Sequence, residues 1–228
     1  MALYHKEIYL KSPELERPSV KAVIRTYRTS DFAELIRIQA ESFPPPYPEE
    51  LLWSREQLSS HLSHYPEGAI CVEVDGELAG SMTSLRMAWD PDHPQSHTWA
   101  EVTDDGYIRN HQPDGNTLYI VDLCVRPKYR KWGLAQWMMQ AMYHLVIEQG
   151  LDRVLGAGRM PGYHKVAERL TPEQYLGQVV EGKLHDQVIS FLLRCGRVPV
   201  GVAADYLDDE ESCNYAALME WRNPFKGS

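Results

Sequence analysis

Residues 119–135 read YIVDLCVRPKYRKWGLA, and this stretch decides the fold. It continues a near-continuous apolar run that begins at residue 117, as expected for a strand buried on both faces. Pro127 ends the strand. From Lys131 onward, apolar residues recur at helical spacing as far as Gly150, a helix-stop signal. Residues 152–158 predict a second strand, and a strand, a helix and a strand in this order predict a right-handed parallel crossover.

The turn between the first strand and the helix has the composition of an anion-binding site. Gly133 and Ala135 open the helix, where the N–H groups of the first turn lack intrahelical partners and the helix dipole adds partial positive charge. Small residues let a ligand approach the backbone, while Arg130 and Lys131 add full charges. We therefore predict a pyrophosphate site here. Neither GxxxxGK[ST] nor GxGxxG is present, which argues against a P-loop and a dinucleotide-binding fold.

The remaining patterns predict one domain over residues 1–228. Strands are predicted over 20–28, 68–74 and 77–88, with Asp75-Gly76 as a hairpin turn. The first helix must stop at Pro44, the second ends near Leu62, one begins at Thr171, and His185 or Asp186 caps the last, which Gly196 ends. The predicted additions are a loop insertion over 90–116, a helical insertion over 161–184 and two C-terminal strands over 197–222.

Composition narrows the function classes. The chain has 228 residues and a net charge of −9, with 43% hydrophobic and 24% charged residues, which is ordinary for a globular protein. The acidic balance argues against nucleic-acid binding, and no apolar run is long enough to cross a membrane. The charged N-terminus does not resemble a secretory signal, and the four cysteines form no CxxC. We therefore expect a cytoplasmic protein with reduced cysteines.

The motif Arg130-x-x-Gly133-x-Ala135, directly after Val125-Arg126-Pro127, resembles the acetyl-CoA signature of the GNAT N-acetyltransferase superfamily. The order of elements over 20–204 is similar to that family throughout. The resemblance implies an α/β (α+β) acyl-CoA N-acyltransferase fold. Its mixed twisted sheet would have about seven strands, helices on both faces and a splayed central parallel pair.

A narrower resemblance rests on three further stretches. Residues 97–125, 158–175 and 207–221 resemble the acetyltransferase module that precedes a carbon–nitrogen hydrolase (nitrilase-like) domain in some proteins. We expect this chain to carry that module alone.

The family resemblance implies acetyl-CoA as the acetyl donor. In the family, the splayed strands free backbone groups that pair with the pantetheine arm like an added strand. A freed N–H near Leu123 would also stabilise the oxyanion of the tetrahedral intermediate. The family's usual Asn near the start of the last helix is matched here by His185. The implied contacts of acetyl-CoA are Leu123, Cys124, Val125, Arg130, Lys131, Trp132, Gly133, Leu134, Ala135 and His185.

Acetyl transfer to an amine also needs a proton acceptor, because an alkyl amine with a pKa near ~10.4 is mostly protonated at neutral pH. Asp122, an ionisable residue inside the apolar strand, is the candidate base, and a purely structural carboxylate is the alternative. The family often carries Glu on this strand, at positions held here by Tyr119 or Val121. We place Tyr119 on the acceptor side.

The leaving thiolate needs a proton donor. Many relatives use a Tyr four residues before the Gly that ends the last helix, where this chain has Leu192. Tyr163 and His164 are the predicted substitutes, although Tyr163 can simply pack and His164 can simply cap. Arg159 is predicted to orient an acidic group on the acceptor, with pairing to a nearby carboxylate as the alternative.

Our leading hypothesis is therefore an N-acetyltransferase acting on a primary amine of a small molecule or a peptide. The acidic surface favours a cationic acceptor, with Glu41, Glu49, Glu50 and Glu56 near it. The alternative is a non-catalytic acyl-CoA sensor or a docking module for an amidase or nitrilase-type partner. A homodimer through the C-terminal strands is also predicted. We expect no metal, since the loop histidines His93, His97 and His111 lack a rigid frame. For Trp53, Trp89, Trp99 and Trp132, packing is favoured over stacking on a ligand.

Overall fold

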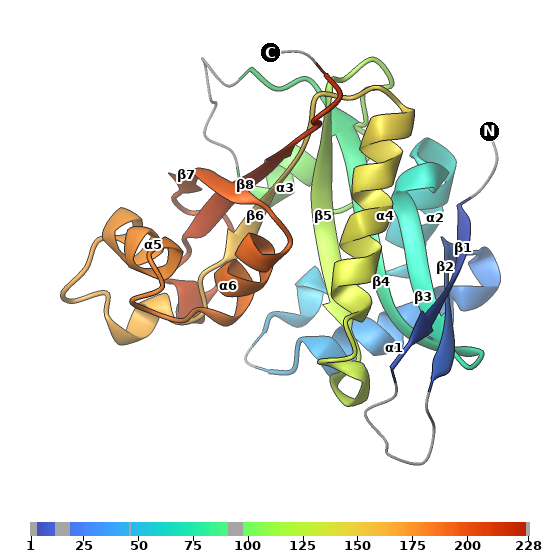
Figure 1. Cartoon of the computed structure of the whole chain (residues 1–228), viewed down its shortest axis with the longest axis horizontal. Coiled ribbons are helices and arrows are strands. Elements are labelled where there is room, and N and C mark those ends of the chain that lie inside the picture. Colours follow the sequence, from blue (N-terminus) through green and yellow to red (C-terminus); the bar gives the residue numbers. More distant parts are fainter. Residues whose placement is uncertain (1–3, 12–18, 46, 91–97, 227–228) are drawn as a thin grey trace.

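The computed structural model describes residues 1–228 apart from 1–3, 12–18, 46, 91–97 and 227–228, and its centre is an eight-stranded sheet (Figure 1). The strand order is β1-β2-β3-β4-β5-β6-β8-β7, and only β5 and β6 are parallel neighbours. The predicted mixed sheet is confirmed, with one strand more than expected. The strands are β1 His5–Leu10, β2 Val20–Thr26, β3 Ala69–Val74, β4 Glu77–Met87, β5 Thr117–Val125, β6 Arg153–Arg159, β7 Val198–Ala203 and β8 Ala216–Arg222.

Helices cover both faces of this sheet. In Figure 1, α4 and α6 lie on one face, and α1 and α2 lie on the other. The 90–116 insertion, predicted as a loop, contains a short helix, α3. Within the described residues, no helix combines the length and the apolar character needed to cross a bilayer. The helices are α1 Phe32–Ser42, α2 Arg55–His64, α3 Trp99–Thr103, α4 Leu134–Glu148, α5 Pro172–Val180 and α6 Gln187–Arg194.

Local signals explain where these elements begin and end. Asp75 and Gly76 have φ angles of 50° and 85°, as a two-residue type I′ hairpin turn between β3 and β4 requires. Asp186 caps α6, since its Oδ1 accepts the N–H groups of Val188 and Ile189, both at 2.9 Å. Of the two caps considered for this helix, the structure therefore selects Asp186 and leaves His185 exposed just before it.

The parallel pair at the centre of the sheet separates after three residues. Thr117, Leu118 and Tyr119 of β5 lie opposite Arg153, Val154 and Leu155 of β6. Beyond Tyr119, β5 pairs only with β4, and β6 pairs only with β8. The expected splay is therefore present, and it opens a gap between the carboxyl-terminal halves of β5 and β6.

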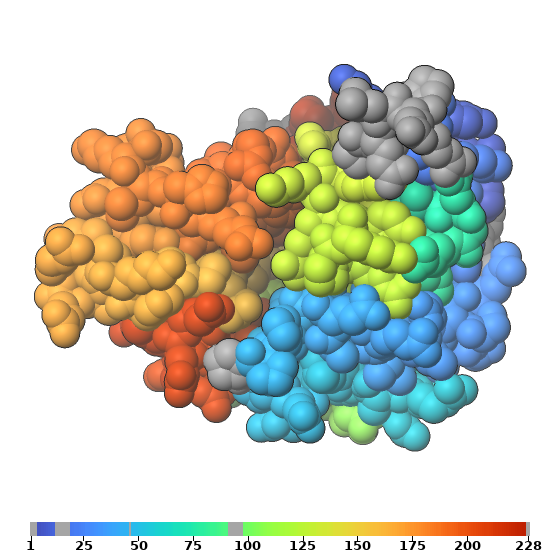
Figure 2. All heavy atoms as spheres, turned by 90° about the horizontal axis from the view of Figure 1, so that it is seen from below, coloured from blue at the N-terminus to red at the C-terminus, as the bar shows by residue number. Residues whose placement is uncertain are grey.

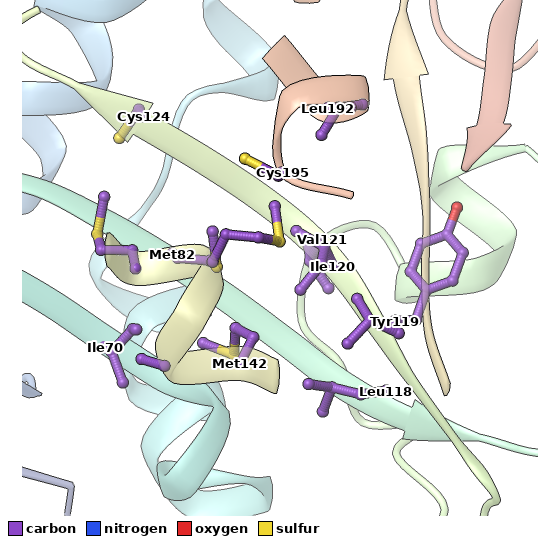
Figure 3. Packing of buried hydrophobic residues seen from close by; sticks show 14 of the residues in the cluster. Ile70, Met82, Leu118, Tyr119, Ile120, Val121, Cys124, Met142, Leu192 and Cys195 are labelled. Carbon is purple, nitrogen blue, oxygen red and sulfur yellow. The ribbon is translucent and has the colours of Figure 1, made fainter. Parts of the chain in front are cut away.

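The hydrophobic core occupies both faces of the sheet, and one part of it lies where α4 and α6 pack on β5 and its neighbours. Figure 3 shows Leu118, Ile120 and Val121 of β5 among sulfur-containing side chains such as Met82 and Met142. Leu192 of α6 joins this cluster and is 6% exposed. Leu192 occupies the position at which many relatives carry a tyrosine, so this chain has a buried apolar side chain there.

Candidate functional site

The start of α4 presents backbone donors that the chain itself does not use. Lys131 and Gly133 have φ angles of 70° and 79°, and such left-handed residues turn successive N–H groups toward one side. No side chain caps the helix, and the space around the Cα of Gly133 is open. Among the described residues, no acceptor faces the amide N–H groups of Lys131, Gly133, Leu134, Ala135 and Gln136.

The free backbone N–H groups at the start of α4 are not all the ones that we predicted. The amides of Arg130 and Trp132 bond to the carbonyls of Pro127 and Tyr129, at 3.2 and 3.4 Å, so the expectation is corrected for these two backbone groups. The Arg130 guanidinium donates to the Ser42 carbonyl at 3.0 Å. Gln136, one residue beyond the expected motif, contributes a donor instead. The structure thus supports an anion seat at this turn, built mainly from backbone.

The basic cluster before the helix divides into two parts. Arg126 is 5% exposed, and its guanidinium bonds to carboxylates of Glu34 and Glu41 on α1 and of Glu77 on β4. Lys128 also pairs with Glu77, at 2.5 Å. We call Arg126 with these three glutamates the Arg126 cluster. Only Arg130 and Lys131 are left without an ion pair in the described structure, and both are exposed beside the free amides.

Backbone groups of β5 face the gap at alternate residues. The Arg126 N–H donates to the Ala79 carbonyl of β4 at 2.8 Å, which fixes the phase of the antiparallel ladder. By alternation, Cys124 faces Ser81 on β4, while Leu123 and Val125 turn their N–H and C=O groups away from β4 and into the gap. The expectation is therefore corrected for Cys124, because its backbone belongs to the β4 ladder and its Sγ lies 3.3 Å from the Ser81 Oγ.

The surface of the molecule is hollowed beside the segment that leads into α4. Figure 2 shows a hollow between the yellow-green segment that leads into α4 and the orange segment that carries α6. The free amides at the start of α4 follow directly after the carboxyl-terminal end of β5, whose free backbone groups face the gap. His185 is exposed just before α6, and its expected contact with acetyl-CoA stays a prediction.

A bulge marks the point where the strands part. The β4–β5 register shifts between Thr83 and Ser84, which leaves Val121 as the extra residue of β5. The Val121 carbonyl accepts the indole N–H of Trp99 from α3 at 3.1 Å. The bulge thus redirects the strand immediately before Asp122 and is held in place by the inserted helix.

Asp122 has the properties of a base that is ready to accept a proton. The residue is half-buried, but its Oδ2 is enclosed and has no hydrogen-bond partner among the described residues. Burial raises the pKa of this carboxyl to about 7, while the Cys124 thiol, the Gln39 amide and the Leu123 N–H oppose the rise. The Leu123 N–H interacts with the Asp122 carboxyl, and the backbone of Leu123 faces the gap. The Asp122 carboxyl therefore lies at the edge of the gap.

Gln39 of α1 is a site residue that sequence reasoning missed. Its side chain is 2% exposed, and its Oε1 accepts the backbone N–H of Trp53. This bond fixes the orientation of the amide, so the NH₂ group is the part left to donate toward Asp122. No periodicity signals this role, because Gln39 lies in an ordinary amphipathic helix more than eighty residues before Asp122.

The two predicted proton donors have other partners. Tyr163 is 5% exposed, its hydroxyl donates to the Leu170 carbonyl at 3.0 Å, and its ring packs on Tyr175 and Tyr215. The expectation for Tyr163 is wrong, because this hydroxyl is already used in packing the 161–184 insertion. The His164 Nδ1 donates to the Glu211 carbonyl at 2.9 Å and leaves Nε2 available. A catalytic role for His164 stays a prediction.

The two predicted acceptor contacts are also occupied. Arg159 makes a bidentate pair with Asp209, at 2.7 and 2.6 Å, and its Cζ lies 5.6 Å from the centre of the Tyr47 ring. It therefore follows the alternative of pairing with a nearby carboxylate. Tyr119 has no exposed surface, and its hydroxyl lies 3.0 Å from the Tyr206 hydroxyl. Direct acceptor contacts by Arg159 and Tyr119 are corrected accordingly.

The remaining candidates are the loop histidines, the four tryptophans and the four glutamates. His93 and His97 lie outside the described residues, while the His111 Nδ1 accepts the Arg86 N–H at 3.0 Å and its ring stacks on Tyr65. No group of three possible metal ligands occurs among the residues that the structure describes. Trp53 and Trp89 are buried, whereas Trp99 and Trp132 are half-buried. Among the four glutamates, Glu41 pairs with Arg126, and Glu50 lines a surface pocket together with Trp99 and Tyr206.

Comparison with known proteins agrees with this geometry. Residues 32–171 match the model of the Acetyltransferase (GNAT) family. The chain is 52% identical over 202 residues to Bacillus subtilis YkwB, named an uncharacterized N-acetyltransferase, and the match covers 89% of each chain. It is 40% identical over 211 residues to the B. subtilis probable hydrolase YhcX, covering 92% of this chain but only 40% of that protein.

A solved structure extends the similarity of fold. The GNAT-like decarboxylase GphF, determined in complex with isobutyryl-CoA, matches with a TM-score of 0.71 at 22% identity. The match covers 88% of this chain and 98% of that one. At this identity the likeness concerns the fold alone.

Proposed function

We propose that this chain, which belongs to the acetyltransferase (GNAT) family, transfers the acetyl group of acetyl-CoA to a primary amine by direct attack within a ternary complex. The family makes it an N-acetyltransferase with acetyl-CoA as co-substrate, whereas the acceptor and the catalytic residues belong to the proposal. The observation that carries the proposal is the unpartnered Oδ2 of Asp122 at the edge of a gap lined by free backbone groups.

The donor side of the reaction rests on backbone groups. The five free amides at the start of α4, with Arg130 and Lys131 beside them, would hold the pyrophosphate. The N–H and C=O groups of Leu123 and Val125 would pair with the pantetheine arm like an additional strand. This pairing would fix the thioester beside the Leu123 N–H, which would have to exchange the Asp122 carboxylate for the developing oxyanion.

The acceptor side of the reaction uses Asp122. Its carboxylate would accept a proton from the substrate ammonium, directly or through water, and so free the nitrogen lone pair. The amine nitrogen would then attack the thioester carbon, so that a C–N bond forms and the C–S bond breaks. The amide and CoA are the products. A pKa of about 7 suits a base that must be ionised near neutral pH.

One observation favours the alternative of a non-catalytic acyl-CoA sensor. Leu192 is buried among apolar side chains, and the Tyr163 hydroxyl is engaged, so neither supplies the thiolate with a proton. An enzyme with this site would have to release the thiolate to solvent or protonate it through His164.

Release of free thiol from acetyl-CoA in the presence of a panel of amines tests the proposal. An acetyltransferase yields thiol in proportion to acetylated amine. A sensor binds CoA in a calorimetric titration and yields neither product with any amine, which would overturn the proposal.

The narrower relationship to hydrolase-fused modules is supported by the match to YhcX, of which the chain spans 40%. An interaction with a separate hydrolase-type partner belongs to this proposal, as does the homodimer. The dimer prediction rests on β7, which forms an edge of the sheet and exposes Val198 and Val200.

A further inference from the structure

The inserted helix α3 reaches the strand that carries Asp122 through one side chain. The Trp99 indole N–H donates to the Val121 carbonyl at 3.1 Å. Val121 is the extra residue of the β5 bulge, and the β4–β5 register gives it no partner on β4. In the described structure, this carbonyl therefore takes its hydrogen bond from the 90–116 insertion and not from the neighbouring strand.

This hydrogen bond acts directly on the residue that follows the bulge. The Val121 carbonyl and the Asp122 N–H belong to one planar peptide group, so a bond to the carbonyl fixes the orientation of the whole plane. That plane sets the direction in which the Asp122 side chain leaves the strand, and bulges commonly redirect a side chain in this way. The Trp99 indole is therefore placed to hold the Asp122 carboxyl in one direction.

A second hold on Asp122 comes from α1 and involves the tryptophan next to Trp99. The Trp53 backbone N–H donates to the Gln39 Oε1, which leaves the Gln39 NH₂ group to donate to the Asp122 carboxyl. The ring centres of Trp53 and Trp99 lie 6.3 Å apart. The backbone and the side chain of Asp122 are thus held by two neighbouring tryptophans from distant segments of the chain.

A glycine lets these two rings and α2 approach one another. A Cβ on Gly106, whose φ angle is 78°, would lie 2.8 Å from the Trp53 ring and 2.9 Å from the Trp99 ring. The Gly106 carbonyl accepts the Nε2 N–H of His61 from α2 at 2.6 Å. The Trp99 backbone N–H donates to the Tyr206 carbonyl at 2.8 Å. The indole therefore has a fixed position that does not depend on a bound ligand.

The titratable groups that act on Asp122 are neutral near pH 7, because burial raises the pKa of each of them. They are the Cys124 thiol on β5, the Tyr27 hydroxyl after β2 and the Tyr47 hydroxyl between α1 and α2. The other charged groups that act on Tyr47 are the paired Arg159 and Asp209. A change in the titration of Asp122 therefore reports a change in the surroundings of its own carboxyl.

We propose that Trp99 is a positioning residue for the acetyl transfer, because its indole N–H holds the peptide plane before Asp122 and keeps the carboxyl enclosed at the edge of the gap. The inference rests on the proposed role of Asp122 as the base. Trp99 acts through Asp122 and not on the thioester or the amine. The inserted helix α3 thereby becomes a working part of the acceptor side, although it belongs to neither of the strands that form the gap.

The test removes the indole N–H and keeps a ring at position 99. We expect Trp99→Phe to lower kcat about tenfold, while KM for acetyl-CoA stays within about twofold. A carboxyl that is no longer held in its enclosed position gains access to water, so the acidic limb of the rate profile should move down by about one pH unit. Replacement of Trp99 by 3-benzothienylalanine, in which sulfur takes the place of the N–H, keeps the shape of the ring system. This variant should show the same shift.

The substitution Trp53→Phe is the matched control. It also shortens one of the two neighbouring rings and removes an indole N–H, but in the described structure the Trp53 indole makes no hydrogen bond to β5. The backbone N–H that holds Gln39 remains. We expect its kcat to stay within about threefold of the wild type and its acidic limb to stay in place.

Two results would overturn the inference. One is an equal loss of rate in Trp99→Phe and Trp53→Phe with an unchanged acidic limb, and the other is a benzothienylalanine variant that behaves like the wild type. If the wild type acetylates no amine, the proposed function fails, and NMR titration of the ¹³C-labelled Asp122 carboxyl still decides about Trp99. A midpoint that falls by about one pH unit in the Trp99 variants supports the inference, and a midpoint that stays or rises overturns it.

Discussion

The two sides of β5 offer different kinds of groups to the two proposed ligands. At the start of α4, the free groups are five backbone amides, and their geometry depends on two left-handed residues and on the absence of a capping side chain. On the α1 side, the groups are side chains from distant parts of the chain, such as Gln39, Trp99, Asp122 and Tyr206. The first arrangement would bind any pyrophosphate, whereas the second can be changed by substitution of single side chains. The comparison suggests that the donor is fixed by the fold and the acceptor by this particular sequence.

The substitution Asp122→Asn is the strongest test of the acceptor side. We expect kcat/KM to fall about 10²–10³-fold, because the amide cannot accept the proton of the ammonium. The wild-type rate should rise with pH through about 7 as Asp122 ionises, and the variant should lose this limb of the profile. Steady-state kinetics against pH measures both effects. An unchanged rate and profile would remove Asp122 from the mechanism, while an unchanged Kd for CoA would show that the donor side is independent of it.

The same substitution should make the protein more stable at alkaline pH. The pKa of Asp122 is raised by folding, so the folded state favours the protonated carboxyl, and stability is lost as pH rises from about 4 through about 7. Asn cannot ionise and avoids this loss. We expect Asp122→Asn to gain about 2–4 kcal/mol in the free energy of unfolding at pH near 8 and almost nothing near 4. Urea titrations at the two pH values measure the difference, and an equal gain at both would contradict the assigned pKa.

The substitution Gly133→Glu tests the donor side. A carboxylate at this open position would lie beside the amides that the phosphates need, and we expect Kd for CoA to rise about 100-fold. Gly133→Ala is the matched control, because it imposes the same cost at a φ angle of 79° without adding charge. Calorimetry with CoA should show only a severalfold loss for Ala. Tight binding by the Glu variant would place the pyrophosphate elsewhere.

The substitution Gln39→Glu tests the acceptor side through a smaller expected effect on the rate. Glu keeps an oxygen for the Trp53 N–H but replaces the donor that faces Asp122 with a second carboxyl. Two adjacent carboxyl groups raise one pKa, so we expect the acidic limb of the rate profile to move up by about one pH unit. The rate at pH near 7 should fall about tenfold. Gln57→Glu, at another buried glutamine, should leave the limb in place, and a shift in both variants would remove the special role of Gln39.

The sequence predicted the order of β5, the turn and the start of α4 well, because local signals determine these elements. The apolar run of β5, the stop at Pro127 and the small residues at the start of α4 lie within twenty residues of one another. The acceptor side could not be predicted in the same way. Tyr163 and Arg159 were reasonable candidates by residue type, but Leu170 and Asp209 bind their polar groups, and no sequence pattern reveals such pairings. Trp99 lies on a helix within a stretch that reads as a loop.

The Arg126 cluster has a consequence for how the two substrates meet. One buried guanidinium joins α1, which carries Gln39, to the junction between β5 and the α4 turn. The proposed phosphate site and the wall beside Asp122 are therefore linked through the buried Arg126 guanidinium, and neither can shift without breaking one of its ion pairs. Carrier and amine would thus arrive at a preset spacing, and either could enter first, since neither has to assemble the other's half of the enclosure.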